Sequence, residues 1–312
     1  MVWAIKFLRR SLLLSPSANP LTLPRSDSVR YHIVHTTTYT YDRPVSLQPH
    51  ALRLRPRCDG CQKLHSFSLE VIPEPAKVYQ VIDLEGNSVV RALFHRTTDH
   101  LCFKVTSLVE THRTNPFDFL LEPWATRLPI DYPASLLSNL QPYFQRFGLP
   151  TTVDSVVAQL AQEVYLAVAG ETVAFLTELN QRIYQNCQHM IRETGEPFPA
   201  ALTWTQKLGS CRDLSVLFME ACRALGLAAR FVSGYQEGDP NQKERDLHAW
   251  AEVYLPGAGW RGYDPTNGLA VADRHVTLVA SALPRHAAPV SGNFHGGGIQ
   301  LGMQYHVSIQ SL

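Results

Sequence analysis

The sequence contains no apolar run that approaches the ~20 residues of a membrane-spanning helix. It also lacks a charge excess of either sign, because 28 Lys and Arg residues against 27 Asp and Glu residues leave a formal net charge of +1. A surface that binds a polyanion is usually strongly basic. The local basic cluster of Arg53, Arg55 and Arg57 with Lys63 alternates as the solvated face of a strand would. We therefore expect no nucleic acid and no membrane among the partners of this protein.

The chain also lacks the short motifs that hold common metals and cofactors. Its 13 histidines include no HExxH zinc motif, and no glycine-rich segment has the spacing that cradles phosphate. Its 6 cysteines are scattered, which is not the pattern of a disulfide-stapled scaffold. The close pair Cys58 and Cys61 has only His50 and His65 as weak further zinc ligands, so we expect a loop with two reduced thiols. The sequence predicts no cofactor, no metal and a reducing, cytoplasmic location.

A chain of 312 residues can bury a sizeable core and suggests about two domains. Residues 1–29 begin with a basic and apolar mixture that Pro16 and Pro20 interrupt, so we expect a poorly ordered extension and no signal peptide. Residues 30–125 are expected to form an antiparallel β domain and residues 126–312 a second domain. The expected strands of the first are 31–41, 64–72, 78–84, 88–95 and 101–109; the second is expected to have helices at 153–168 and 172–186 and a last strand near 304–309.

The second domain has a cysteine, Cys211, at the start of a predicted amphipathic helix. After Ser210, apolar residues recur at steps of three and four. Unpaired N–H groups and the positive end of the helix dipole stabilise an anion there, and the pKa of such a thiol can fall from about 8.5 to about 3.5–7.5. Cys211 is therefore a candidate nucleophile, whereas Cys222 on the same helix is expected to be a small buried hydrophobe. The recurring residues are Leu214, Leu217, Phe218, Ala221 and Leu225.

A histidine and an aspartate follow on a predicted hairpin. Residues 246–255 alternate as a strand and carry His248, and the turn at 256–259 reverses the chain into residues 260–264. This pairing would return Asp264 to the neighbourhood of His248, and Pro265 keeps that aspartate extended. Cysteine, histidine and aspartate in this order are the side chains that a thiol acyl-transfer enzyme uses.

These segments resemble the catalytic core of the transglutaminase-like superfamily, in its bacterial branch related to papain-type cysteine hydrolases. The matching words are GSCRDLSVLFMEACRALGLAARFVSGY (209–235), LHAWAEVYLPGAGW (247–260) and YDPTNG (263–268). In addition, YHIVHTTTYTYDRPVSLQPHALRLRPR (31–57) is similar to the β-rich N-terminal region of bacterial members. The resemblance implies an α+β fold, in which a helix with the nucleophile packs on an antiparallel sheet. It implies that Cys211 is the nucleophile, His248 the base and Asp264 the orienting carboxylate.

Neighbouring residues have competing interpretations. Asp246 and Asp213 are rival carboxylates, but Asp246 is too close in sequence to the histidine to orient its ring, and Asp213 is expected to stabilise the helix N-terminus. Arg212 is expected to point to solvent, with assistance to the thiolate as the alternative. The backbone N–H of Cys211 is a natural oxyanion donor. The second donor stays open, because residues 186–189 match imperfectly the place where family members often have an aromatic residue.

The expected reaction is thiol-dependent acyl transfer on a protein or peptide substrate. His248 takes the proton of Cys211, the thiolate attacks an amide carbonyl, and a thioester forms as the amine leaves. Water would resolve the thioester in a peptidase or amidase, and a primary amine would resolve it in a transglutaminase. The resemblance to bacterial members favours hydrolysis of a peptide or isopeptide bond. Protein-glutamine amine transfer and a non-catalytic binding module are the alternatives.

Overall fold

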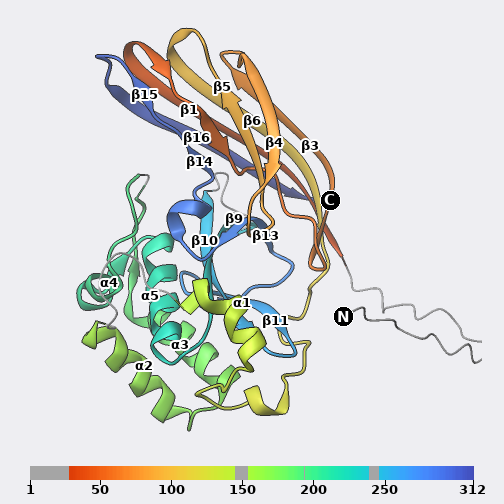
Figure 1. The fold of residues 1–312 in the computed structure, drawn as a ribbon, viewed down its shortest axis with the longest axis vertical. Coiled ribbons are helices and arrows are strands. Elements are labelled where there is room, and N and C mark those ends of the chain that lie inside the picture. The colour runs from red at the N-terminus through yellow and green to blue at the C-terminus, as the bar shows by residue number, and fades with distance from the viewer. Residues whose placement is uncertain (1–27, 145–153, 193, 239–245) are drawn as a thin grey trace, which may run out of the picture.

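The computed structural model describes residues 28–144, 154–192, 194–238 and 246–312. The expected N-terminal extension therefore lies almost entirely outside the described residues. The chain folds into a β-rich region and an α+β core that contact each other (Figure 1). This architecture confirms the predicted fold class. None of the helices in the described part of the chain is long and apolar enough to cross a membrane.

The β-rich region consists of two antiparallel sheets. One has the order β15-β1-β6-β3, with β16 also paired to β1, and the other has the order β14-β2-β5-β4. Alternation in β1 buries Tyr31, Ile33, His35 and Thr37 on one face, as a half-buried strand requires. The first six strands are β1 (Val29–Leu47), β2 (His50–Leu52), β3 (Gln62–Ile72), β4 (Lys77–Ile82), β5 (Ser88–Leu93) and β6 (Thr97–Thr111).

The C-terminal end of the chain returns to these sheets. Strand β16 pairs antiparallel with β1, from Tyr31 opposite Ser311 to Tyr41 opposite Gln300. Residues 290–311, which the sequence analysis grouped with the second domain, thus complete the sheets of the first. Pairing between the two ends of a chain leaves no local pattern that sequence periodicity can detect. The C-terminal strands are β14 (Val290–Ser291), β15 (Phe294–His295) and β16 (Gln300–Ser311).

The segment after β2 differs from its prediction. Residues 53–57 form no strand, so the expected solvated strand face was wrong. Arg53 Nη1 donates to the Ala288 carbonyl at 3.1 Å and to the Ser291 hydroxyl at 3.0 Å. Arg57 Nη1 donates to Asn87 Oδ1 at 2.8 Å. Two of the three arginines, Arg53 and Arg57, therefore connect segments that are distant in the sequence.

The core packs helices on an antiparallel sheet of order β12-β11-β10-β9-β13. Helix α5 contacts β9 and β10, and Phe218 of α5 stacks on Tyr263 with ring centroids 5.5 Å apart. The helices are η1 (Pro123–Ala125), α1 (Ala134–Phe144), α2 (Ser155–Ala167), α3 (Thr172–Asn186), α4 (Ala200–Gln206), α5 (Cys211–Ala224) and η2 (Pro284–Ala287). The strands are β7 (Gln188–His189), β8 (Leu208–Gly209), β9 (Ala229–Gln236), β10 (Leu247–Leu255), β11 (Gly259–Asp264), β12 (Leu269–Ala270) and β13 (His275–Ser281).

Side chains of the β-rich region cover the outer edge of β13. The Gln62 amide donates to the Thr277 carbonyl at 2.9 Å and accepts from the Thr277 N–H at 2.7 Å. Asn87 makes the same two bonds with Ala280, at 2.9 and 3.0 Å. These amides replace a neighbouring strand, so the edge is not left open. One continuous hydrophobic cluster also spans both regions.

Candidate active site

Helix α5 holds Cys211 in its first turn. Ser210 is the N-cap, and its backbone N–H and hydroxyl each donate to Asp213 Oδ2 at 2.7 Å. Asp213 is fully buried, and its two oxygens lie 2.7 and 2.8 Å from Arg192 Nη1. Asp213 therefore stabilises the helix N-terminus, as predicted, and fixes the backbone that carries the thiol.

Strands β10 and β11 bring a histidine and an aspartate together. They pair antiparallel, with Ala251 opposite Tyr263, which confirms the predicted hairpin. His248 Nε2 lies 2.7 Å from Asp264 Oδ2. The other ring nitrogen of His248, Nδ1, is then the one available to Cys211, and the two side chains are hydrogen-bonded. The structure thus brings Cys211, His248 and Asp264 into one chain of contacts.

The Asp264 carboxylate is fully buried and held on both oxygens. Oδ1 accepts from the backbone N–H groups of Thr266 at 3.0 Å and Asn267 at 3.3 Å. Oδ2 also accepts from Asn267 Nδ2 at 2.8 Å and lies 3.2 Å from His275 Nε2. A carboxylate held this way cannot rotate freely, so it fixes the orientation of the imidazole that it contacts.

The ionisation of these groups is shifted in opposite directions. Burial by itself raises the pKa of Cys211, but hydrogen bonds to His189 and His248 outweigh it and bring the pKa to about 6. Burial lowers the pKa of His248, but the charge and hydrogen bond of Asp264 outweigh it and raise the pKa to about 10. Burial also opposes ionisation of Asp264, yet the charge of His248 holds its pKa well below the ordinary value. A thiolate–imidazolium pair is therefore favoured near neutral pH.

His189 is a site residue that the sequence analysis did not assign. Strand β7 pairs parallel with β8 and sets His189 opposite Gly209, two residues before Cys211. The exposed His189 side chain is hydrogen-bonded to the Cys211 thiol. Its only sequence signal was a place in residues 186–189, where the match to the aromatic position was imperfect. His275 gave no signal, because it contacts Asp264 from a strand outside the three matching words.

Two other residues considered for a role at this site, Asp246 and Arg212, do not contact His248 or the thiol in the described structure. Asp246 is exposed just before β10, and it is Asp264 that contacts His248. Arg212 does not point to solvent: it donates to the carbonyls of Arg192 at 2.6 Å and Gly195 at 2.8 Å. It therefore holds the segment before α4 against the start of α5, which corrects the expectation.

Comparisons with known proteins agree with this architecture. Residues 31–110 match the bacterial transglutaminase-like N-terminal region, and residues 158–265 match the transglutaminase-like superfamily. Uncharacterised proteins of Mycobacterium tuberculosis and Mycobacterium bovis are 30% identical over 274 residues, which cover 83% of this chain and 85% of theirs. A protein-glutamine gamma-glutamyltransferase of Pseudomonas aeruginosa is 36% identical over 69 residues, 20% of this chain and 10% of that protein.

A solved structure has the same fold. The crystal structure of a protein of Cytophaga hutchinsonii, proposed to be a cysteine protease, superposes with a TM-score of 0.67 at 21% identity and covers 92% of each chain. The fold and the order of its parts define a transglutaminase-like core behind a β-rich N-terminal region. The chain belongs to the transglutaminase-like superfamily. This membership supports an activity of cysteine-based acyl transfer or proteolysis.

Proposed function

We propose that this protein is a cysteine peptidase or amidase in which Cys211 is the nucleophile, His248 the base and Asp264 the orienting carboxylate. The observation that carries the proposal is the chain of contacts from the Cys211 thiol through His248 to Asp264 Oδ2, which lies 2.7 Å from His248 Nε2. The geometry is the one that nucleophilic catalysis needs, because the base contacts the nucleophile and a third group orients the base. It also makes an idle binding module the weaker alternative.

In the proposed reaction the Cys211 thiolate attacks the carbonyl carbon of an amide. The carbonyl oxygen becomes an oxyanion, which the Cys211 backbone N–H stabilises at the start of α5. His189, which contacts the same sulfur, supplies the second donor. His248 then gives its proton to the leaving amine, so the C–N bond breaks and a thioester remains.

Breakdown of the thioester restores the protein. His248 takes a proton from water, the hydroxide attacks the thioester carbonyl, and the C–S bond breaks to give a carboxylic acid and the Cys211 thiolate. Water is present at about 55 M, whereas an amine competes only when the enzyme binds and orients it. We infer that hydrolysis of a protein or peptide amide dominates, in a reducing compartment such as the cytoplasm that keeps the thiol active.

Amine transfer is the second candidate. The observation in its favour is the 36% identity over 69 residues to a protein-glutamine gamma-glutamyltransferase. The two reactions share every step up to the thioester, so a single incubation separates them. Native protein is mixed with glutamine-containing peptides and a labelled primary amine, with Cys211→Ala as the blank.

Cleaved peptide or released ammonia in excess of incorporated label, both absent from the blank, is the result expected for a hydrolase. Label in excess would replace hydrolysis with transamidation. The absence of both products, together with an unreactive Cys211 thiol, would leave only the binding module.

A further inference from the structure

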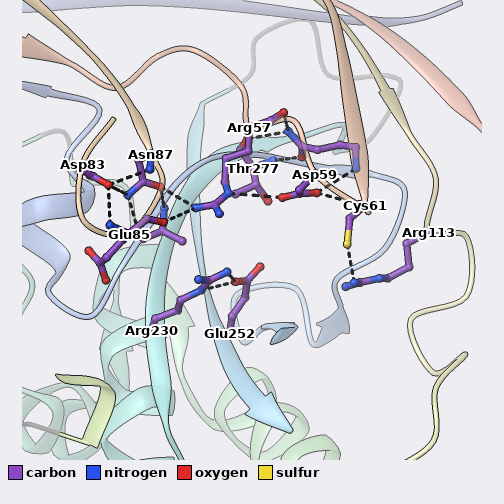
Figure 2. Close-up of polar contacts among 12 residues, drawn as sticks. Arg57, Asp59, Cys61, Asp83, Glu85, Asn87, Arg113, Arg230, Glu252 and Thr277 are labelled. Atoms are coloured by element: carbon purple, nitrogen blue, oxygen red, sulfur yellow. Dashed lines mark hydrogen bonds and ion pairs between the residues drawn. The ribbon is translucent and has the colours of Figure 1, made fainter. Parts of the chain in front are cut away.

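A cavity of about 360 Å³ lies between the β-rich region and the core sheet. The turn at residues 57–62 and Arg113 line it from the first region. Arg230 of β9, Glu252 of β10 and Trp260 of β11 line it from the second. Ligand sites occur preferentially at such junctions and have volumes of about 300–1,000 Å³. Figure 2 shows the arginines and carboxylates that face one another there.

Two of the three arginines that line the cavity already have carboxylate partners. Arg230 and Glu252 are both buried, with Nε and Nη2 at 2.7 and 2.6 Å from Glu252 Oε2. Arg57 Nε lies 3.5 Å from Asp59 Oδ2. These two pairs leave the third arginine, Arg113, as the cavity's excess charge.

Arg113 faces a thiol where the other two face carboxylates. Its Nη2 donates to Cys61 Sγ at 2.6 Å, and no carboxylate in the described parts of the chain forms an ion pair with it (Figure 2). Burial raises the pKa of the Cys61 thiol, so this partner is neutral at physiological pH. Burial and then the charge of Arg113 lower the pKa of nearby Arg261, so positive charge is in excess at this end.

We propose that the cavity binds a small carboxylate, which the guanidinium fork of Arg113 recognises. A planar guanidinium holds a carboxylate with two parallel N–H···O bonds. Three arginines against Asp59 and Glu252 leave one net positive charge, which suits a singly charged carboxylate better than a phosphate. Trp260 and Val271 also line the cavity and give the body of the ligand an apolar contact.

Two kinds of molecule carry this chemistry, a free organic acid and the acidic side chain of a peptide. N-acetylleucine represents the first and a blocked Gly-Glu-Gly peptide the second. N-acetylleucinamide, which has the same shape as the first but no charge, is the matched control. The probe that binds at the lower concentration shows whether the site prefers a free organic acid or an acidic side chain of a peptide. Binding of either probe supports the proposed carboxylate site.

Protection of Cys61 locates the binding. In the Cys211→Ala protein, each probe is titrated while alkylation of Cys61 and of exposed Cys58 is followed by peptide mapping. We expect saturable slowing at Cys61, at least tenfold at saturation, and no change at Cys58. N-acetylleucinamide is expected to protect neither. Because Cys211 is absent, this experiment is independent of the proposed catalytic function.

Variants test the recognition group. Arg113→Gln should weaken protection at least tenfold, and Arg113→Lys, which keeps the charge but lacks the fork, should also weaken it. The exposed Arg96 provides the control Arg96→Gln, which should bind as the native chain does. Equal protection by acid and amide, protection by neither acid, or unchanged affinity in folded Arg113→Gln and Arg113→Lys would overturn the proposal.

Discussion

The Cys211 thiol is hydrogen-bonded to the imidazoles of His189 and His248, which makes its ionisation the most direct residue-scale measurement. With its pKa lowered to about 6 and that of His248 raised to about 10, the thiolate–imidazolium pair is populated between those pH values. Because the thiolate is the reacting form, alkylation should rise through about pH 6 and then stay level. Iodoacetamide labelling with peptide mapping from pH 4 to pH 9 measures this.

Cys58 is the internal control for that measurement because it is exposed. At pH 6, Cys211 should react at least tenfold faster than Cys58. In His248→Ala the rise should move toward the ordinary range of a cysteine, about 8.5. Equal rates at the two cysteines near pH 6 would remove the basis for an activated thiolate.

The second prediction at the residue scale concerns the carboxylate of Asp264. Asp264→Asn keeps the size of the side chain but loses the charge that fixes the His248 tautomer, and we expect turnover to fall by about 10²–10⁴. Asp246→Asn is the matched control, since Asp246 is exposed, and it should change turnover less than twofold. Both variants should have native circular dichroism. A larger loss in Asp246→Asn would transfer the orienting role to that residue.

Which site residues could be predicted from the sequence depended on whether each has a recognisable local sequence context. Cys211, His248 and Asp264 were found because each has a local context: a helix start, an alternating strand and a residue before proline. His275 has no such context, and its contact with Asp264 Oδ2 depends on where β13 lies. A residue that acts through a neighbour on another element carries no signal in a single sequence.

At the scale of elements, the covered edge of β13 gives a stability prediction. Gln62 is buried and bonds both the N–H and the carbonyl of Thr277, but the carbonyl also accepts from the Arg57 N–H at 3.0 Å, so Gln62→Ala leaves the Thr277 N–H without its partner. One such group costs about 1–3 kcal/mol, and we expect a loss of about that size in the free energy of unfolding. Urea denaturation measures it.

Gln80→Ala in β4 is the control, because Gln80 is exposed and its amide donates to the hydroxyl of Ser88 on the neighbouring strand. It should change the free energy of unfolding by less than about 0.5 kcal/mol. Equal effects of the two substitutions would mean that the Gln62 amide does not hold the edge. The strands themselves were predictable from alternation, but this capping was not, since it joins the first residue of β3 in one region to a strand of the other.

At the scale of the whole molecule, two features join the regions. The C-terminal strand β16, which follows the core in the sequence, pairs with β1 of the β-rich region, and one hydrophobic cluster spans both regions. The hydrophobic cluster that contains Phe218 of α5 also contains Ile33 of β1 and Val307 of β16. Sequence analysis drew the boundary between the regions where alternating strands give way to helical periodicity. It expected the strand near residues 304–309, which lies within β16, but not its place in the first sheet, because the strand that pairs with it is at the opposite end of the chain.

This connection predicts one cooperative unfolding transition. Deletion of residues 299–312 removes β16, leaves β1 paired on one side only, with β6, from Tyr31 to Thr40, and exposes the site of buried Val307. We expect the urea midpoint to fall for the entire chain, with fully buried Trp250 in β10 reporting the same shift as far-ultraviolet circular dichroism. Deletion of exposed Leu312 alone should leave the midpoint nearly unchanged. If Trp250 fluorescence kept its native midpoint while circular dichroism shifted, the core would be independent of the β-rich region, and the shared cluster would not couple them.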